Sequence, residues 1–191
     1  GNLNVYRTSW QDRTFTSSFN PGQDNPNTPV DERTELYFAN ILGVDALHQG
    51  IELDFTYTPI AGLSIYGMAS TGDWAWQENV NGVTIFDEGQ NEIGTISTLY
   101  IKNLKVGDAA QTTAALGIDY DFMENLKVGL TYNYYSDIYA DYDPTDRDGE
   151  DLLGVDAFEI PDYGLVDINT SFDFKIGDLD ATLYGNINNL F

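Results

Sequence analysis

The stretch 111–137, QTTAALGIDYDFMENLKVGLTYNYYSD, decides how this chain folds. It holds two long runs of alternating apolar and polar residues, joined at Glu124-Asn125. The apolar positions are Ala114, Leu116, Ile118, Tyr120 and Phe122 in the first run, and Leu126, Val128, Leu130, Tyr132 and Tyr134 in the second. Alternation with period two predicts a β-hairpin with one apolar and one polar face. Each run has about a dozen residues, which is longer than a usual soluble strand and suits a tilted strand that crosses a bilayer.

The composition narrows the class of protein. Hydrophobic residues make up 42% of the 191 positions, yet no run approaches the ~18 apolar residues of a membrane helix, so a membrane-spanning form has to be a barrel. Acidic residues number 31 and basic residues 8, and the net charge of -23 argues against nucleic acid as a partner. The chain has no cysteine, which excludes disulfide scaffolds and thiol chemistry.

Short and long connections alternate along the rest of the chain. Further strands are predicted over 2–10, 35–58, 63–77, 163–176 and 179–191, with an irregular upper part at 36–50 and an ambiguous face near Gly67. Short turns are predicted at 59–62, 124–125 and 177–178. Long connections are predicted at 11–34, 78–109 and 141–162, the second containing a small hairpin of 83–86 with 95–101. Strict alternation is typical of an outer-membrane barrel with tight periplasmic turns and long extracellular loops.

Aromatic residues gather near both ends of the predicted strands. Those before short turns are Tyr57, Tyr120, Phe122, Phe172 and Phe174, and those near the opposite ends are Trp74, Trp76, Tyr132 and Tyr134. From Leu126 to Tyr134 a strand rises roughly 27 Å, or about 21 Å of height at a tilt of ~40°, which approaches the ~25 Å apolar band of a barrel. The predicted fold is therefore all-β, an antiparallel up-and-down transmembrane β-barrel, with a soluble β-sandwich as the alternative.

Several segments resemble the C-terminal barrel half of TonB-dependent outer-membrane receptors, particularly those of Bacteroidetes-type bacteria. They are YRTSWQDRT (6–14), YFANILGVDALHQGIELDFTYTPIAGLSIYGMASTGDW (37–74), VGDAAQTTAALGIDYDF (106–122), YGLVDINTSFDFKIG (163–177) and LYGNINNLF (183–191). The resemblance covers nearly the whole chain, and its most specific parts are HQGIELDFTYTP at 48–59 and NINNLF at 186–191. It implies a 22-stranded barrel filled by a plug, of which residues 1–191 supply about seven strands. Because the chain begins and ends inside predicted strands, we expect a partial barrel domain, a fragment without the N-terminal plug and the final strand.

The resemblance also implies a function and partners. We expect an outer-membrane receptor of a Gram-negative bacterium that imports a scarce nutrient of the siderophore, cobalamin, oligosaccharide or peptide class by energy-coupled transport. The implied partners are outer-membrane lipid, the nutrient ligand, the plug domain of the same full-length chain and the TonB energy-coupling complex. The alternative is a non-transport outer-membrane or secreted β-domain that acts as an adhesin or binding module.

Ligand-binding candidates are aromatic residues at the predicted outer strand ends, where they can stack on a ligand in an extracellular vestibule: Trp74, Trp76, Tyr139 and Tyr142. Membrane-girdle aromatics are the alternative interpretation. The single histidine, His48, is interpreted as a polar strand residue.

The acidic residues give no site of their own in the sequence. The loop 143–151 is similar to a calcium loop, but Pro144 and Val155 stand where an EF-hand needs carboxylates, so we predict no metal and no cofactor. Carboxylate pairs such as Asp119 and Asp121 are interpreted as acids that line the lumen, because residues two apart on a strand share a face. No nucleophile, base or metal cluster stands out, and we predict that the chain is not an enzyme.

Overall fold

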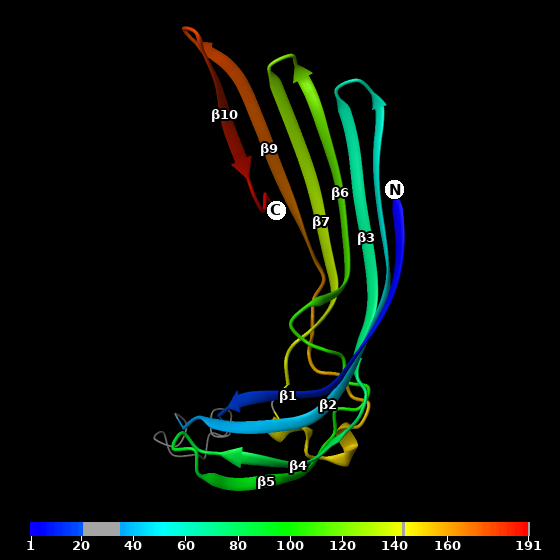
Figure 1. The fold of residues 1–191 in the computed structure, drawn as a ribbon, viewed down its shortest axis with the longest axis vertical. Coiled ribbons are helices and arrows are strands. Elements are labelled where there is room, and N and C mark those ends of the chain that lie inside the picture. The colour runs from blue at the N-terminus through cyan, green and yellow to red at the C-terminus, as the bar shows by residue number, and fades with distance from the viewer. Residues whose placement is uncertain (21–34, 143, 191) are drawn as a thin grey trace.

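A curved antiparallel sheet dominates the computed structural model, which describes residues 1–20, 35–142 and 144–190 (Figure 1). Its long strands are β1 (Asn2–Phe19), β2 (Tyr37–Ile60), β3 (Leu63–Trp76), β6 (Ala110–Met123), β7 (Leu126–Tyr139), β9 (Tyr163–Ile176) and β10 (Leu179–Ile187). Each pairs with the next long strand along the chain, in the order β10-β9-β7-β6-β3-β2-β1. This is an up-and-down wall of seven strands, which confirms the predicted fold class. The wall is open, with β1 and β10 at its edges.

Shorter elements complete the ten-stranded sheet at one end. They are the strands β4 (Val80–Phe86), β5 (Glu92–Leu99) and β8 (Glu159–Ile160). Two 3₁₀ helices, η2 (Pro144–Arg147) and η3 (Glu150–Leu152), lie between β7 and β8 in the chain. No helix in the described part of the chain has the length and apolar character needed to cross a membrane.

The hairpin β6–β7 forms with the predicted turn and faces, and its register shifts between Asp121 and Met123. Ile118 lies opposite Leu130, and Asp119 lies opposite Gly129. The same parity runs across the wall, so that an apolar row passes from β3 to β9 through Ile65, Ile118, Leu130 and Ile168, beside a polar row of Ser64, Asp119, Gly129 and Asn169. One face of the wall is therefore apolar although it is exposed, as in Leu116 at 51% and Leu130 at 46%. The opposite face, which we call the polar face, carries hydroxyl, amide and carboxylate groups.

The register resolves the ambiguous face of β3. Gly67 lies opposite Phe55 on one side and Leu116 on the other, so it belongs to the apolar face with Leu63 and Ile65. Tyr66 belongs to the polar face, and its hydroxyl lies 2.9 Å from that of Thr131.

The predicted connection 11–34 is wrong in its first part, because β1 continues to Phe19. The pairing of β1 with β2 shifts between Trp10 and Arg13, and Asp12 there has a φ of 52°. A β-bulge of this kind bends a strand, and Figure 1 shows the ends of β1 and β2 turning across the molecule. The stretch 36–50 belongs to β2, and it is irregular as predicted, because Gly43 has a φ of 68° and the pairing with β1 shifts again between Arg13 and Phe15. The remaining residues of this connection, 21–34, lie outside the described residues.

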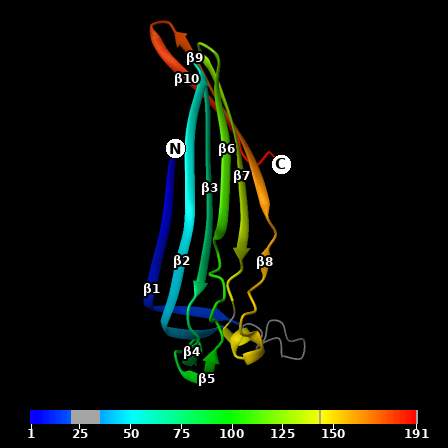
Figure 2. The ribbon, with the colours of Figure 1, turned by 90° about the vertical axis from the view of Figure 1, so that its right-hand side faces the viewer.

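The bent strand ends pack with β4 and β5 into a separate unit, the loop body, formed by residues 13–19, 37–44 and 80–104. Its buried core comprises Phe19, Ala39, Ile41, Val44, Val80, Val83, Ile96, Leu99, Ile101 and Leu104, joined by Tyr142. The predicted small hairpin is present within it as β4 and β5, in which Val83 pairs with Ile96. Figure 2 shows this unit at one end of the wall, opposite the three short turns. Segments predicted as loops therefore build a packed structure.

Two other predicted boundaries need correction. β2 extends through Pro59 to Ile60, so the turn to β3 consists of Ala61 and Gly62 alone. The last strand ends at Ile187, short of the predicted Phe191, which lies outside the described residues.

Candidate functional site

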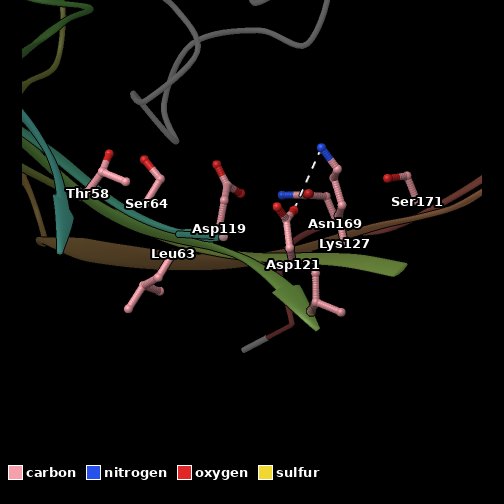
Figure 3. A pocket seen from close by; sticks show the side chains of 10 residues that line it. Thr58, Leu63, Ser64, Asp119, Asp121, Lys127, Asn169 and Ser171 are labelled. Carbon is pink, nitrogen blue, oxygen red and sulfur yellow. Dashed lines mark ion pairs between the residues drawn. The ribbon is translucent and has the colours of Figure 1, made fainter. Parts of the chain in front are cut away.

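The polar face holds two groups of side chains that can contact a solute, one near the short turns and one near the loop body. The first surrounds a shallow hollow of about 460 Å³ on β3, β6, β7 and β9. Figure 3 shows Thr58, Ser64, Asp119, Asp121, Asn169 and Ser171 projecting to one side of the sheet, with Leu63 on the other.

Charge within this hollow is partly compensated. The Nζ of Lys127 lies 3.7 Å from Oδ1 of Asp121. Asp119 and Asn169 both lean over Gly129, which lacks the Cβ that would fill the space between them. The two aspartates thus stand on the polar face as predicted, where they offer hydrogen-bond acceptors to whatever passes along the wall.

The second group is a row of rings on β1, β2 and β3, which we call the aromatic platform: Tyr6, Trp10, His48 and Trp74. The ring centroids of Trp10 and His48 are 4.5 Å apart, and those of His48 and Trp74 are 5.5 Å apart. The indole Nε1 of Trp74 donates a hydrogen bond to Oη of Tyr6 at 2.8 Å. Cross-strand pairing places these rings on the polar face, since His48 lies opposite Thr8 and Trp74.

Two glycines create the room for the platform. Gly50 and Gly72 face each other across β2 and β3, and Gly50 also faces Tyr6. A Cβ on Gly50 would overlap the Tyr6 ring, and one on Gly72 would overlap the indole of Trp74. The rings of Tyr6 and Trp74 can therefore lie over the backbone of the wall.

Gln111 fixes the backbone that carries Trp74. Its side-chain oxygen accepts a hydrogen bond from the N–H of Trp74 at 2.8 Å, and its Nε2 donates to the carbonyl of Trp74 at 3.0 Å. Gln111 is only 2% exposed, so these bonds are shielded from water. Lys105 holds the preceding residue, Asp73, through an ion pair of 2.6 Å, and this hydrogen bond raises the pKa of the Lys105 ammonium group. Trp74 is thus held in place from two sides.

The structure separates the four predicted ligand residues. Only Trp74 joins the platform. The ring centroids of Trp76 and Phe15 are 5.6 Å apart in a stacked pair, and the ring centroid of Tyr142 lies 6.4 Å from that of Phe15 in an edge-on pair. Tyr142 and Tyr139 are 8% and 9% exposed, and burial raises the pKa of both phenols. Their role in ligand binding stays a prediction. The girdle interpretation is wrong for Trp74, because it lies on the polar face.

Sequence reasoning missed Tyr6, Trp10 and Gln111, and treated His48 only as a polar strand residue. A regular hairpin about the turn at Ala61-Gly62 would pair Gly50 with Asp73. The register shift between Tyr57 and Ile60 brings Gly50 opposite Gly72 instead, and the sequence gives no signal of this shift. Within the described ranges no three metal-ligating side chains gather at one point. Arg147 in the acidic connection is buried and donates to the carbonyl of Val155 at 2.5 Å, which makes it a structural residue there.

Comparison with known proteins gives one result. The family model described as "TonB dependent receptor-like, beta-barrel" matches residues 1–190. A search of curated proteins found no match.

Proposed function

The chain belongs to the TonB-dependent receptors as part of their β-barrel, and from this premise we propose that the full protein imports a scarce nutrient by energy-coupled transport. The family consists of receptors and transporters of the Gram-negative outer membrane. The nutrient belongs to the siderophore, cobalamin, oligosaccharide or peptide class. The Bacteroidetes-type assignment is part of this proposal.

The observation that carries the proposal is the pair of opposite faces on one wall. Side chains such as Ile118 and Leu130 are 39% and 46% exposed and lie in one continuous apolar row. A water-soluble protein of this size would have to cover such a face, whereas lipid covers it in a barrel. The polar face then lines the route of the solute, and outer-membrane lipid is the partner of the apolar face.

The edges of the wall support a larger assembly. Among the described strands β1 pairs only with β2, and β10 pairs only with β9. Unpaired edges invite further strands, and barrels of this class close around a plug. We assign these parts to the same full-length protein, with the plug acting as the link to the TonB energy-coupling complex.

Ligand capture is assigned to the loop end of the wall. Trp74 provides a ring on the polar face, and the loop body stands beside it. Trp76 and Tyr142 contribute by fixing the loop body to the outer end of β3, since their rings pack with its core, and Tyr139 is buried at the outer end of β7. In this proposal the loop body is extracellular.

Growth of a deletion strain tests the proposal. We expect slow growth when one nutrient class is limiting, either iron-siderophore, cobalamin, an oligosaccharide or a peptide, and normal growth when that nutrient is abundant. The full-length gene should restore growth, and a copy without the TonB-contacting segment should not. Unchanged growth on all four classes, together with loss of attachment to a surface, would favour the adhesin alternative.

A further inference from the structure

We propose that the aromatic platform binds an organic cation, meaning a guanidinium or ammonium group carried on a flat apolar frame. The inference rests on the proposed function, because it names the class of solute captured at the mouth of the receptor. Three features of the polar face lead to it: the exposed ring faces, the charges next to them, and the position of Arg13.

The rings are of the type that attracts cations. The face of an indole or phenol ring carries negative potential, and tryptophan is the strongest of these rings. Trp10 is 41% exposed, and Tyr6 and Trp74 are half-buried, so part of each ring remains available. The ring of His48 lies between the two indoles and continues the surface.

Arg13 shows that this surface already holds a guanidinium group. Its Cζ lies 4.6 Å from the centroid of the Trp10 ring. Arg13 follows the bulge in β1, at the edge of the platform, and its side chain is exposed. It therefore occupies a position that a cationic ligand would otherwise take. Removing Arg13 should increase the affinity for such a ligand.

The charges next to the platform favour a cation as well. The next two rows along the polar face carry Glu52, which accepts a hydrogen bond from Asn4 at 3.0 Å, and Asp54, which accepts one from Asn2 at 3.0 Å. The amide groups of Asn4 and Asn2 carry no charge that would compensate a carboxylate. Farther across the wall, Lys127 and Lys175 pair with aspartates at 3.7 and 3.5 Å. A cleft lined mainly by one sign of charge concentrates solutes of the opposite sign, so this face attracts cations and repels anions.

Calorimetric titration of the full-length receptor in detergent tests the proposal with a matched pair of probes. Nα-acetyl-L-arginine β-naphthylamide and Nα-acetyl-L-citrulline β-naphthylamide share one flat frame, and only the first carries a positive charge, on its guanidinium group. We expect the arginine probe to bind about tenfold more tightly than the citrulline probe. The preference should weaken at high salt, because ions screen the carboxylates.

Four variants locate the binding. Trp74→Leu should lower the affinity for the arginine probe about tenfold, Trp74→Tyr should retain most of it, and Arg13→Gln should raise it. Tyr134→Leu is the matched control, because it removes a ring from the apolar face of β7, and it should change nothing. Heat-modifiable gel migration checks that each variant assembles.

Equal affinity for the two probes, or weaker binding by Arg13→Gln, would overturn the inference. Failure here is distinguishable from failure of the proposed function. A receptor that supports growth on a limiting nutrient but does not discriminate the probes retains the proposed function and loses only the cation site. A receptor that prefers the arginine probe but supports no nutrient-dependent growth keeps the site and loses the proposed function.

Discussion

Replacing Leu130 with arginine tests the assignment of the two faces. Leu130 lies midway between Leu126 and Tyr134 on β7, with Ile118 and Ile168 opposite it on the neighbouring strands. Four residues of strand rise about 14 Å, or about 10 Å of height at a tilt of ~40°, which places Leu130 near the middle of the ~25 Å apolar band. An arginine at that depth costs about 2–4 kcal/mol. The equilibrium constant for folding into the membrane should fall by about 30-fold to 900-fold.

The assay is refolding of the full-length receptor from urea into phosphatidylcholine vesicles, followed by gel migration without heating. Thr131→Arg is the matched control, because the neighbouring side chain points to the polar face. This variant loses the hydrogen bond with Tyr66, worth about 1 kcal/mol. The new arginine lies opposite Asp167 and can form an ion pair with it. We expect Leu130→Arg to assemble poorly and Thr131→Arg to assemble well. Equal yields would refute the face assignment.

Three further predictions concern packing and ionisation. Leu99→Ala should destabilise the loop body by about 2–5 kcal/mol, because this side chain is fully buried. Faster cleavage by a protease added to intact cells should detect this loss of stability. Ile93→Ala is the control, because Ile93 is exposed. Tyr66→Phe should lower the stability of the full-length receptor by about 1 kcal/mol in urea titrations, since it removes the hydroxyl bonded to Thr131. Tyr142→Phe should be close to neutral at pH 7, because the Tyr142 hydroxyl is buried without a partner among the described residues. Burial raises the pKa of Tyr142 in the folded state, so the wild type should lose stability as the pH rises above about 10. The phenylalanine variant should lose less stability over the same pH range, measured as the rate of proteolysis at each pH.

The wall was predictable because its information is local. Alternation sets the face of each side chain. In the hairpin β6–β7 it also decides the register, because a shift between Asp121 and Met123 brings the apolar positions of the two strands opposite each other, which the turn at Glu124-Asn125 alone would not do. The bounds of β9, Tyr163–Ile176, follow directly from this pattern. Gly67 was ambiguous because Tyr66 and Met68, two large residues, occupy the polar face beside it.

The loop body was not predictable, because it depends on contacts between distant segments. Ile41, Val83 and Leu99 meet in one core, yet each stands in a stretch without long alternation. The bulge between Trp10 and Arg13 changes the parity of β1, so that a pattern read from the first strand residues fails beyond it. For the same reason Trp76 and Tyr142 looked like surface rings in the sequence and are packed around Phe15 in the structure.

Topology in the living cell is the most direct test of the central claim that this wall crosses the outer membrane with the loop body outside. The chain has no cysteine of its own, so single cysteines can be introduced in the full-length receptor after any others are replaced. Gly94→Cys lies in β5, where a Cβ meets nothing within 4 Å, and Asp178→Cys lies in the short turn between β9 and β10. A membrane-impermeant maleimide should label Gly94→Cys on intact cells and Asp178→Cys only after the outer membrane is permeabilised. Labelling of both positions on intact cells, or the reverse pattern, would contradict the account.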